Sequence, residues 1–242
     1  MKNKSTVYWA PVFFDEKTDW NMFYYDLESL YDYYKDDISK ESKTNNFFYC
    51  PAFKNVAKNT FLIKNPIDSH YVFEDGVAKV KSKNFTDISA EHTPSLKDNQ
   101  LVCYGLQYIF FSEDPIIAKL TSPFFNQSPH MQYGSLVPGQ IRIDKWFRVL
   151  NLEINLWQNS TELKIDKEEI LAYISFESNE VDIQLKRFTM NDQLMKYAAS
   201  CGSSSQWESF VPLAERYKRF VATRTNKMIL SEIKKNLVDC DV

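Results

Sequence analysis

The sequence LNLEINLW at residues 150–157 alternates between apolar and polar side chains over most of its length. Successive side chains of a β-strand point to opposite faces, so this pattern predicts a strand with one apolar face. A shift of one residue would turn that whole face toward solvent, and the pattern therefore also predicts the register. The apolar face consists of Leu150, Leu152, Ile154 and Leu156.

Short apolar runs separated by turn residues continue on both sides of this strand. They are VYWAPVFF (7–14), FFYCPAF (47–53), FLIK (61–64), HYVF (70–73), VAKV (77–80), LVCYGLQYIFF (101–111), IIAKLTSPFF (116–125), QIRIDKWFRV (140–149), ELKI (162–165), EEILAYISF (168–176) and VDIQLKRF (181–188). Asp75-Gly76 joins two of them and predicts a hairpin. Residues 82–100 are polar and predict an irregular segment. The whole pattern predicts a mainly β (α+β) fold, a barrel or sandwich of short antiparallel strands.

In two parts of the chain the apolar residues have the spacing of a helix instead of a strand. Residues 20–36 place apolar side chains three and four positions apart, which predicts an N-terminal helical segment. Residues 191–200 predict a short helix, and an apolar stripe from Trp207 to Val221 predicts a C-terminal amphipathic helix. We therefore expect a single domain over 1–242, with a β-rich body at about 47–190 and a C-terminal helical segment at about 191–238.

Composition excludes several functional classes. The 242 residues carry a formal net charge of −3, whereas a nucleic-acid-binding protein usually has a basic excess. The 5 Gly residues are scattered, which excludes both glycine-rich phosphate-binding fingerprints. The 4 Cys residues form no C-x-x-C pair, and no secretion signal precedes them, so we expect free thiols. No apolar run approaches the ~20 residues of a membrane helix, so no membrane partner is expected.

Candidates for chemistry are few. None of the 3 His residues lies in a His-x-Asp/Glu pair, and no Gly-x-Ser-x-Gly elbow occurs, so neither a metal, a cofactor nor a catalytic residue is expected. The loop GSLVPG at 134–139 precedes the predicted strands at 140–157 and could form the rim of a pocket. The candidate pocket residues are His130, Asp144, Trp146 and Arg148. The alternative for His130 is a loop residue bonded to a backbone carbonyl.

The two ends of the chain are candidates for a contact surface. Residues 15–37 are rich in aromatic and acidic side chains, whereas residues 207–237 carry seven Lys and Arg. Aromatic and Arg side chains often anchor interfaces, and complementary charge orients the partners. The candidate interface residues are Tyr24, Tyr31, Tyr34, Arg216 and Arg219. The alternative is an aromatic stripe facing an ordinary core beside two solvated charged surfaces.

Several blocks of the sequence resemble a family of uncharacterised proteins encoded by marine tailed phages and some bacteria. The blocks are FFYCPAFKNVAKNTFLIKNPIDSHYVFEDG (47–76), SPFFNQSPHMQYG (122–134), IRIDKWFRVLNLEINLW (141–157), KIDKEEILAYISFE (164–177) and AERYKRF (214–220). Because these blocks are spread from residue 47 to residue 220, the resemblance extends over most of the chain. The resemblance implies a phage-type protein located in the cytoplasm of an infected host cell or in the virion.

The central strands are also similar to the β-clip of trimeric dUTPases, whose catalytic Asp corresponds in position to Asp144. The Arg-Gly-Glu continuation and the Gly-Asp-Arg turn of that family are absent here. Three functions remain open. The first is a non-enzymatic structural or interaction protein that binds a protein partner or itself. The second is an enzyme or nucleotide-binding protein on a β-clip or jelly-roll scaffold, and the third is a host-interaction or anti-defence protein.

Overall fold

The computed structural model describes residues 4–12, 24–35, 49–74, 77–80, 90–94, 100–178, 182–201 and 211–238. Its strands are β1 (Lys4–Pro11), β2 (Thr60–Lys64), β3 (Ser69–Glu74), β4 (Val77–Val80), β5 (Ala90–Pro94), β6 (Gln100–Phe111), β7 (Ile117–Thr121), β8 (Gly134–Leu136), β9 (Gly139–Arg142), β10 (Val149–Leu156), β11 (Glu162–Ile165), β12 (Ile170–Glu177) and β13 (Asp182–Arg187). The helices are α1 (Leu30–Tyr33), α3 (Pro51–Lys58), α4 (Asp192–Cys201), α5 (Leu213–Ala222), α6 (Thr225–Lys235) and the short 3₁₀ helix η4 (Pro129–Gln132).

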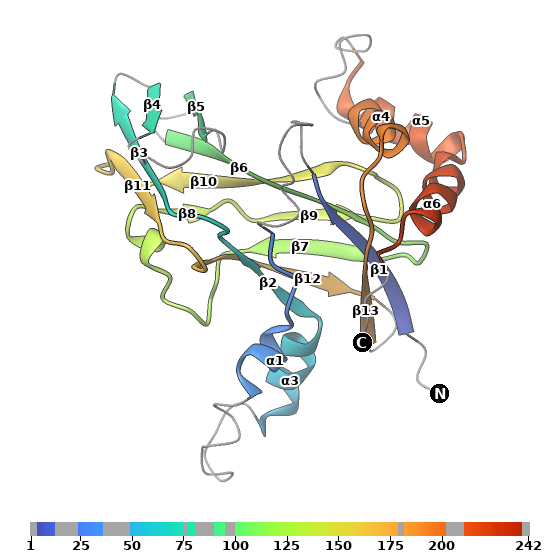
Figure 1. Ribbon diagram of the computed structural model, residues 1–242, viewed down its shortest axis with the longest axis horizontal. Coiled ribbons are helices and arrows are strands. Elements are labelled where there is room, and N and C mark those ends of the chain that lie inside the picture. The colour runs from blue at the N-terminus through green and yellow to red at the C-terminus, as the bar shows by residue number, and fades with distance from the viewer. Residues whose placement is uncertain are drawn as a thin grey trace.

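The strands form three sheets, so the fold is mainly β with flanking helices (Figure 1). Sheet A has the order β13-β1-β6-β10-β8, with β5 also paired to β6. Sheet B has the order β2-β12-β7-β9, and sheet C has the order β11-β3-β4. None of the three closes into a barrel within the described residues. The strands pair antiparallel as predicted, except that β1 and β13 are parallel.

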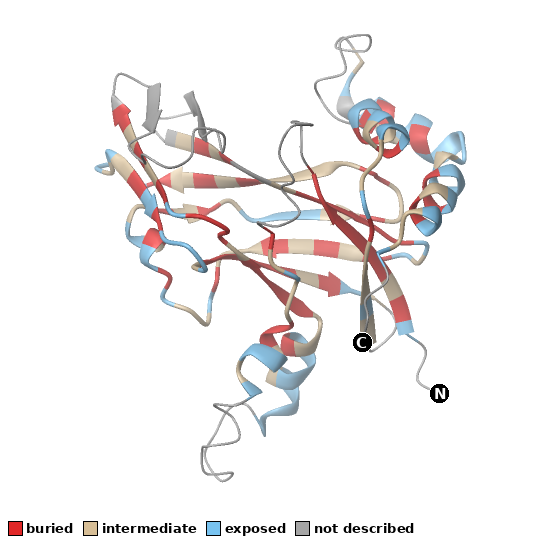
Figure 2. Cartoon of the chain, in the orientation of Figure 1, coloured by how far each residue is buried: buried red, intermediate tan, exposed pale blue. Residues whose placement is uncertain are grey.

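The sheets and helices pack in layers. One face of sheet A packs against sheets B and C to form the inner core. Helices α4–α6 cover the other face of sheet A and form an outer core with it. Helices α1 and α3 pack on the outer side of sheet B. Figure 2 shows buried residues concentrated in the strands, whereas much of α1 and α3 is exposed.

This layering explains why several strands are apolar on both faces. In β1, Val7 and Trp9 belong to the inner core, whereas Tyr8 and Ala10 belong to the outer core. A strand covered on both faces is expected to have a continuous apolar run rather than an alternating one. In β10, by contrast, Leu152, Ile154 and Leu156 are buried and the residues between them are half-exposed, which confirms the predicted register for these three. Leu150, predicted on the same face, is only partly buried, and the pairing of β10 with β6 shifts register between Leu150 and Leu152.

The predicted strand at 47–53 is wrong where the structure describes it, because α3 begins at Pro51. Proline is favoured at the first helical position, since its missing N–H has no helical partner there. The predicted helix at 20–36 is wrong for residues 24–29, and within its second half only Leu30–Tyr33 forms α1. Leu62 N–H donates to Glu28 O (2.9 Å), so this backbone is bonded to the edge of β2 instead. Residues 20–23, 36, 47 and 48 lie outside the described part.

Three further predictions need correction. The strand predicted at 140–149 ends at Arg142, because residues 143–148 turn and place Trp146 and Phe147 in the outer core. The segment predicted as irregular at 82–100 contains β5, which pairs with β6. The C-terminal helix is divided into α5 and α6 at Arg224, whose φ of 55° is left-handed and interrupts the helical backbone. Residues 202–210, including Trp207, lie outside the described part.

The register of β10 generates a test of the inner core. Replacing Ile154 with Ala should lower the free energy of unfolding by about 2–5 kcal/mol, because it leaves a cavity among buried side chains. Replacing the neighbouring half-exposed Glu153 with Ala should cost less than ~1 kcal/mol. Urea denaturation measures both values. Equal costs for the two variants would contradict the register.

The cysteines generate a second test. Cys50, Cys103 and Cys201 are not in disulfides, and Cys240 lies outside the described residues. Cys50 is exposed, whereas Cys201 is buried, and burial raises the pKa of its thiol to about 11. In the folded protein at pH 8, iodoacetamide should modify Cys50 first and Cys201 last, because only the thiolate reacts. Peptide mass spectrometry measures the order, and early modification of Cys201 would contradict its burial. After unfolding without a reductant, four thiols should titrate.

Candidate functional site

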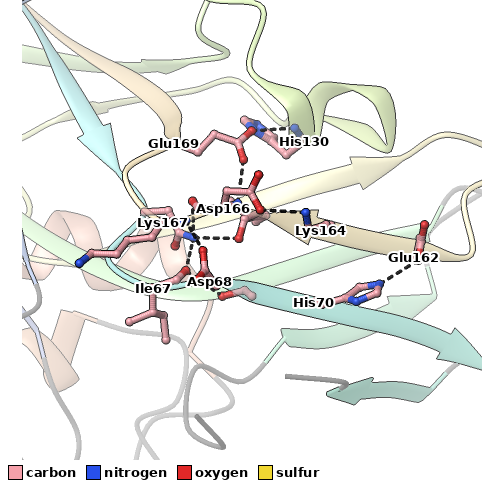
Figure 3. A network of polar contacts seen from close by, with 12 residues as sticks. Ile67, Asp68, His70, His130, Glu162, Lys164, Asp166, Lys167 and Glu169 are labelled. Atoms are coloured by element: carbon pink, nitrogen blue, oxygen red, sulfur yellow. Dashed lines mark hydrogen bonds and ion pairs between the residues drawn. The ribbon is translucent and has the colours of Figure 1, made fainter. Parts of the chain in front are cut away.

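The most deeply buried ion pair of the described residues joins η4 to the turn before β12 (Figure 3). His130 Nδ1 lies 2.7 Å from Glu169 Oε1, and the side chains are only 1% and 5% exposed. The backbone N–H of His130 donates to the same oxygen (2.7 Å), and that of Asp166 donates to Oε2 (2.9 Å). His130, a candidate pocket residue, thus fastens two loops together. Its partner is a carboxylate and not the backbone carbonyl considered from the sequence.

Asn65 holds the neighbouring loop against the same turn. Its side-chain amide donates to the carbonyls of Ile67, Ile165 (3.3 Å) and Asp166 (3.1 Å). Its Oδ1 accepts from the hydroxyl of Tyr104 (2.6 Å), which also contacts Ser69 Oγ (2.9 Å). These bonds satisfy polar groups that burial would otherwise leave without water. Sequence analysis missed Asn65 and Glu169, whose only signals were an Asn-Pro turn and an acidic residue before a strand.

The electrostatics of this network favour a structural role. Burial by itself raises the pKa of Glu169, but the hydrogen bonds from the ring and the backbone N–H of His130 and from Asp166 N–H outweigh it. The pKa of Glu169 is therefore lowered, and its ionised form stabilises the folded state. The bonds from His130 connect η4 to this turn, and the bond from Asp166 N–H closes the turn itself. Within the described residues, no group of three or more His, Cys, Asp or Glu side chains is arranged to hold a metal.

A pocket of about 220 Å³ lies where β9 and β10 separate, and it is the feature nearest to the predicted one. The loop residues Val137, Pro138 and Gly139 line it, as does Arg148, so one candidate pocket residue is in place. Its remaining lining is largely aliphatic and comes from β7, β9, β10 and β12. His130, Asp144 and Trp146 do not line it.

Asp144 and Trp146 have other partners. Asp144 accepts two hydrogen bonds from the Arg142 guanidinium, at 2.7 and 2.8 Å. The pKa of Arg142 is raised, chiefly by this hydrogen bonding. Trp146 is buried in the outer core, where its ring centroid lies 5.1 Å from that of Tyr217 and 6.0 Å from that of Phe220. These residues attach the turn at 143–148 to its surroundings, and the structure does not bring them together with His130.

The interface candidates divide into buried and exposed residues. Tyr24 is buried against Tyr108, and its hydroxyl accepts from the backbone N–H of Gln107 (3.3 Å). Arg216 is only 5% exposed. Tyr24 and Arg216 therefore offer little surface to a partner. Tyr31 and Tyr34 are half-exposed and Arg219 is exposed, near Glu215 (3.8 Å).

Tyr31 and Tyr34 belong to a larger aromatic group that we call the aromatic lobe. It consists of α1, α3 and the turn at 123–126, and its aromatic side chains are Tyr31, Tyr33, Tyr34, Phe53, Phe124 and Phe125. Phe125 lies at its centre, with ring centroids 4.7 Å from Phe53, 5.1 Å from Phe124 and 6.5 Å from Tyr34. Phe124 is 56% exposed and Tyr33 is 38% exposed. The lobe therefore presents aromatic rings to solvent.

Comparisons with models of protein families, with curated proteins and with solved structures found no match to this chain. The function must therefore be argued from the geometry described above. None of the helices in the described ranges is long and apolar enough to cross a lipid bilayer.

The buried ion pair generates a test with a defined pH dependence. The lowered pKa of Glu169 means that its stabilisation is complete above about pH 4.5, its unperturbed value, and is lost as pH falls through the lower folded-state pKa. Glu169→Gln should therefore cost about 1–3 kcal/mol at pH 7, and this difference should shrink at pH 3. Urea denaturation at several pH values measures it.

Glu177→Gln is the matched control for this experiment. Glu177 is the last residue of β12, the strand that follows Glu169, and it pairs with Lys119 but is exposed. Exposed ion pairs contribute little, so this substitution should change the free energy of unfolding by less than ~1 kcal/mol at pH 7. A cost for Glu169→Gln that is the same at pH 7 and pH 3 would show that its charge does not stabilise the fold.

Proposed function

We propose that this chain is a non-enzymatic structural or interaction protein of the tailed-phage type, acting through protein–protein contacts in the infected cell or the virion. The observation that carries this proposal is the aromatic lobe. Aromatic side chains are common interface anchors, because they bury a large area and lose little conformational freedom. An exposed apolar cluster of this kind typically marks a contact site in a soluble protein.

The lobe is suited to rigid contact because its rings support one another. Phe124 packs edge-on against Tyr173 of β12, with centroids 4.8 Å apart. The hydroxyl of Tyr173 in turn donates to Asn126 in the same turn. Lys54 lies 5.5 Å from the ring of Tyr31, and Lys64 lies 4.9 Å from that of Tyr33. An exposed aromatic surface held in place before binding loses less entropy when a partner covers it.

A second exposed surface lies on the other side of the β layers, on α5 and α6 (Figure 1). It combines basic side chains with two exposed apolar ones, Val221 and Met228. We call it the basic helical surface, and its exposed basic residues are Lys218, Arg219, Arg224, Lys227, Lys234 and Lys235. Two different surfaces on opposite sides allow a head-to-tail contact, in which each copy uses one surface toward each neighbour.

We therefore propose that the partner at the aromatic lobe is the basic helical surface of a second copy. Lys and Arg stack favourably over aromatic rings, as Lys54 and Lys64 do within the lobe itself. Val221 and Met228 supply the apolar area for Phe124 and its neighbours. Head-to-tail contacts close into rings when the rotation between copies allows it, a form of assembly that suits a virion or neck component.

The finer description of the scaffold is also a proposal. We infer a sandwich rather than a barrel, since sheet A packs face to face on sheets B and C across the inner core. Kinship with the β-clip remains part of the same proposal, supported by the position of Asp144 in the sequence. The bonds of Asp144 to Arg142 give it a role in holding the turn at 143–148.

Self-association tests the proposed function. Sedimentation velocity from about 1 to 100 µM should show concentration-dependent oligomers of the unmodified chain. Phe124→Ser should weaken association at least ~10-fold, because one buried aromatic anchor typically contributes more than 1.4 kcal/mol. The double variant Arg219→Glu, Lys227→Glu should weaken it similarly. Arg216 is left unchanged, since it is buried and its replacement would disturb the fold.

Trp157→Ser is the control, because Trp157 is an exposed aromatic residue that lies outside both surfaces. Its removal should leave association unchanged, provided that thermal unfolding shows a folded protein. A monomer at every concentration would contradict self-association. Equal weakening by Trp157→Ser and Phe124→Ser would contradict the assignment of the contact to the lobe.

A further inference from the structure

The segment from Gly134 to Arg142 changes sheets, and this creates the pocket between β9 and β10. Its first part, β8, pairs with β10, and the last bond in that direction runs from Val137 N–H to Glu153 O (2.7 Å). After Pro138, which has no N–H to donate, β9 pairs with β7 in sheet B instead. No ladder joins β9 to β10 in the described residues. The pocket lies in this gap, which we call the seam.

The seam opens onto the inner core. Ala118, Leu120 and Ile174, which line the pocket, are also members of the inner core and at most 4% exposed. The pocket volume of about 220 Å³ is below the ~300–1,000 Å³ of pockets for drug-sized ligands. At about 30 Å³ for each water-sized group, it holds roughly seven such groups. The site therefore fits a short aliphatic chain or one side chain.

The two ends of the seam exclude an added peptide strand. At one end, Val137 is bonded to Glu153. At the other end, the turn at 143–148 joins β9 to β10 covalently, and Arg142 is fastened to Asp144. A strand that extended along β10 would have to pass through one of these closures. The occupant must therefore enter end-on, with its apolar part first and its polar end outward.

Arg148 supplies the group that would bind the polar end. It lines the pocket, and its guanidinium has no hydrogen bond or ion pair with any described residue. Arg148 as a whole is half-buried, and an arginine beside an aliphatic cavity matches a carboxylate, which a guanidinium binds through charge-assisted and often paired hydrogen bonds. We propose that the seam binds a short aliphatic carboxylate of about five to eight carbons, with its chain against Leu120 and Ile174 and its carboxylate on Arg148.

The carboxylate of Glu153 suggests the main alternative ligand, a positively charged one. Glu153 also lines the pocket and lacks a side-chain partner in the described residues, so an alkyl ammonium ion would be favoured if this carboxylate dominated. We assign the ligand charge to Arg148, which lies where β10 begins, whereas Glu153 lies at the end of the seam that the bond from Val137 N–H to Glu153 O closes. The seam is separate from the aromatic lobe and the basic helical surface, so this site does not depend on the contact proposed above.

The experiment compares hexanoate with two probes of the same chain length. Full-length protein with ¹³C-labelled Ile, Leu and Val methyl groups is titrated at pH 7 with hexanoate, hexanol and hexylamine. Hexanoate should shift the methyl signals of Leu120, Ile141 and Ile174, with a dissociation constant on the order of 0.1–1 mM, as expected for about eight non-hydrogen atoms. Hexanol should bind at least ~10-fold more weakly, and hexylamine more weakly still.

Three variants assign the roles. Arg148→Met should weaken the binding of hexanoate at least ~10-fold and leave the affinity for hexanol unchanged. Lys145→Met, which removes the same charge from the same turn without touching the pocket lining, should leave both unchanged. Ala118→Leu, checked for folding by its methyl spectrum, should abolish binding of both ligands by filling the cavity. Hexylamine binding as tightly as hexanoate, shifts confined to other methyl groups, or no binding at 20 mM would overturn the proposal.

Discussion

Burial of β1 on both faces is the constraint on which the rest of the structure depends. Val7 and Trp9 complete the inner core, and Tyr8 and Ala10 complete the outer one. In sheet A, β1 pairs with β13 on one side and with β6 on the other. Both the sheet packing and the helical layer α4–α6 therefore contact one short segment. A polar residue at any of these four positions would face a core and would lack a hydrogen-bonding partner there.

Much of the β structure could be predicted from local patterns. The alternation of β10 and the Asp75-Gly76 hairpin signal depend on neighbouring residues only, and both β10 and the β3–β4 pair are present. The parallel pairing of β1 with β13 could not be predicted, because it joins residues about 180 positions apart and leaves no local signature. The prediction of a helix at residues 24–29 was wrong for the same reason. The spacing of this segment's apolar residues is typical of a helix, but its backbone is bonded to β2 instead. β2 lies more than thirty residues later in the sequence, so no local pattern indicates this pairing.

The candidate residues show the same limit. Asp144, Trp146 and Arg148 lie close together in the sequence, yet the turn at 143–148 sends them in different directions, while His130 lies apart from them in η4. Trp146 enters the outer core, while Arg148 reaches the seam, because successive residues of a turn point in divergent directions. Sequence analysis could place a pocket beside the loop at 134–139. It could not show that this loop changes sheets, which is what opens the pocket.

The pairing of β1 with β13 has a consequence for synthesis of the chain on the ribosome. β1 is made about 180 residues before its parallel neighbour, which is complete only after Arg187 has been added. At ~5–20 residues per second, an apolar strand with one free edge waits on the order of ten seconds or more for its partner. Such an edge is a template for pairing between nascent chains. A chain truncated before β13 should therefore depend on chaperones to stay unaggregated, whatever the function of the finished protein.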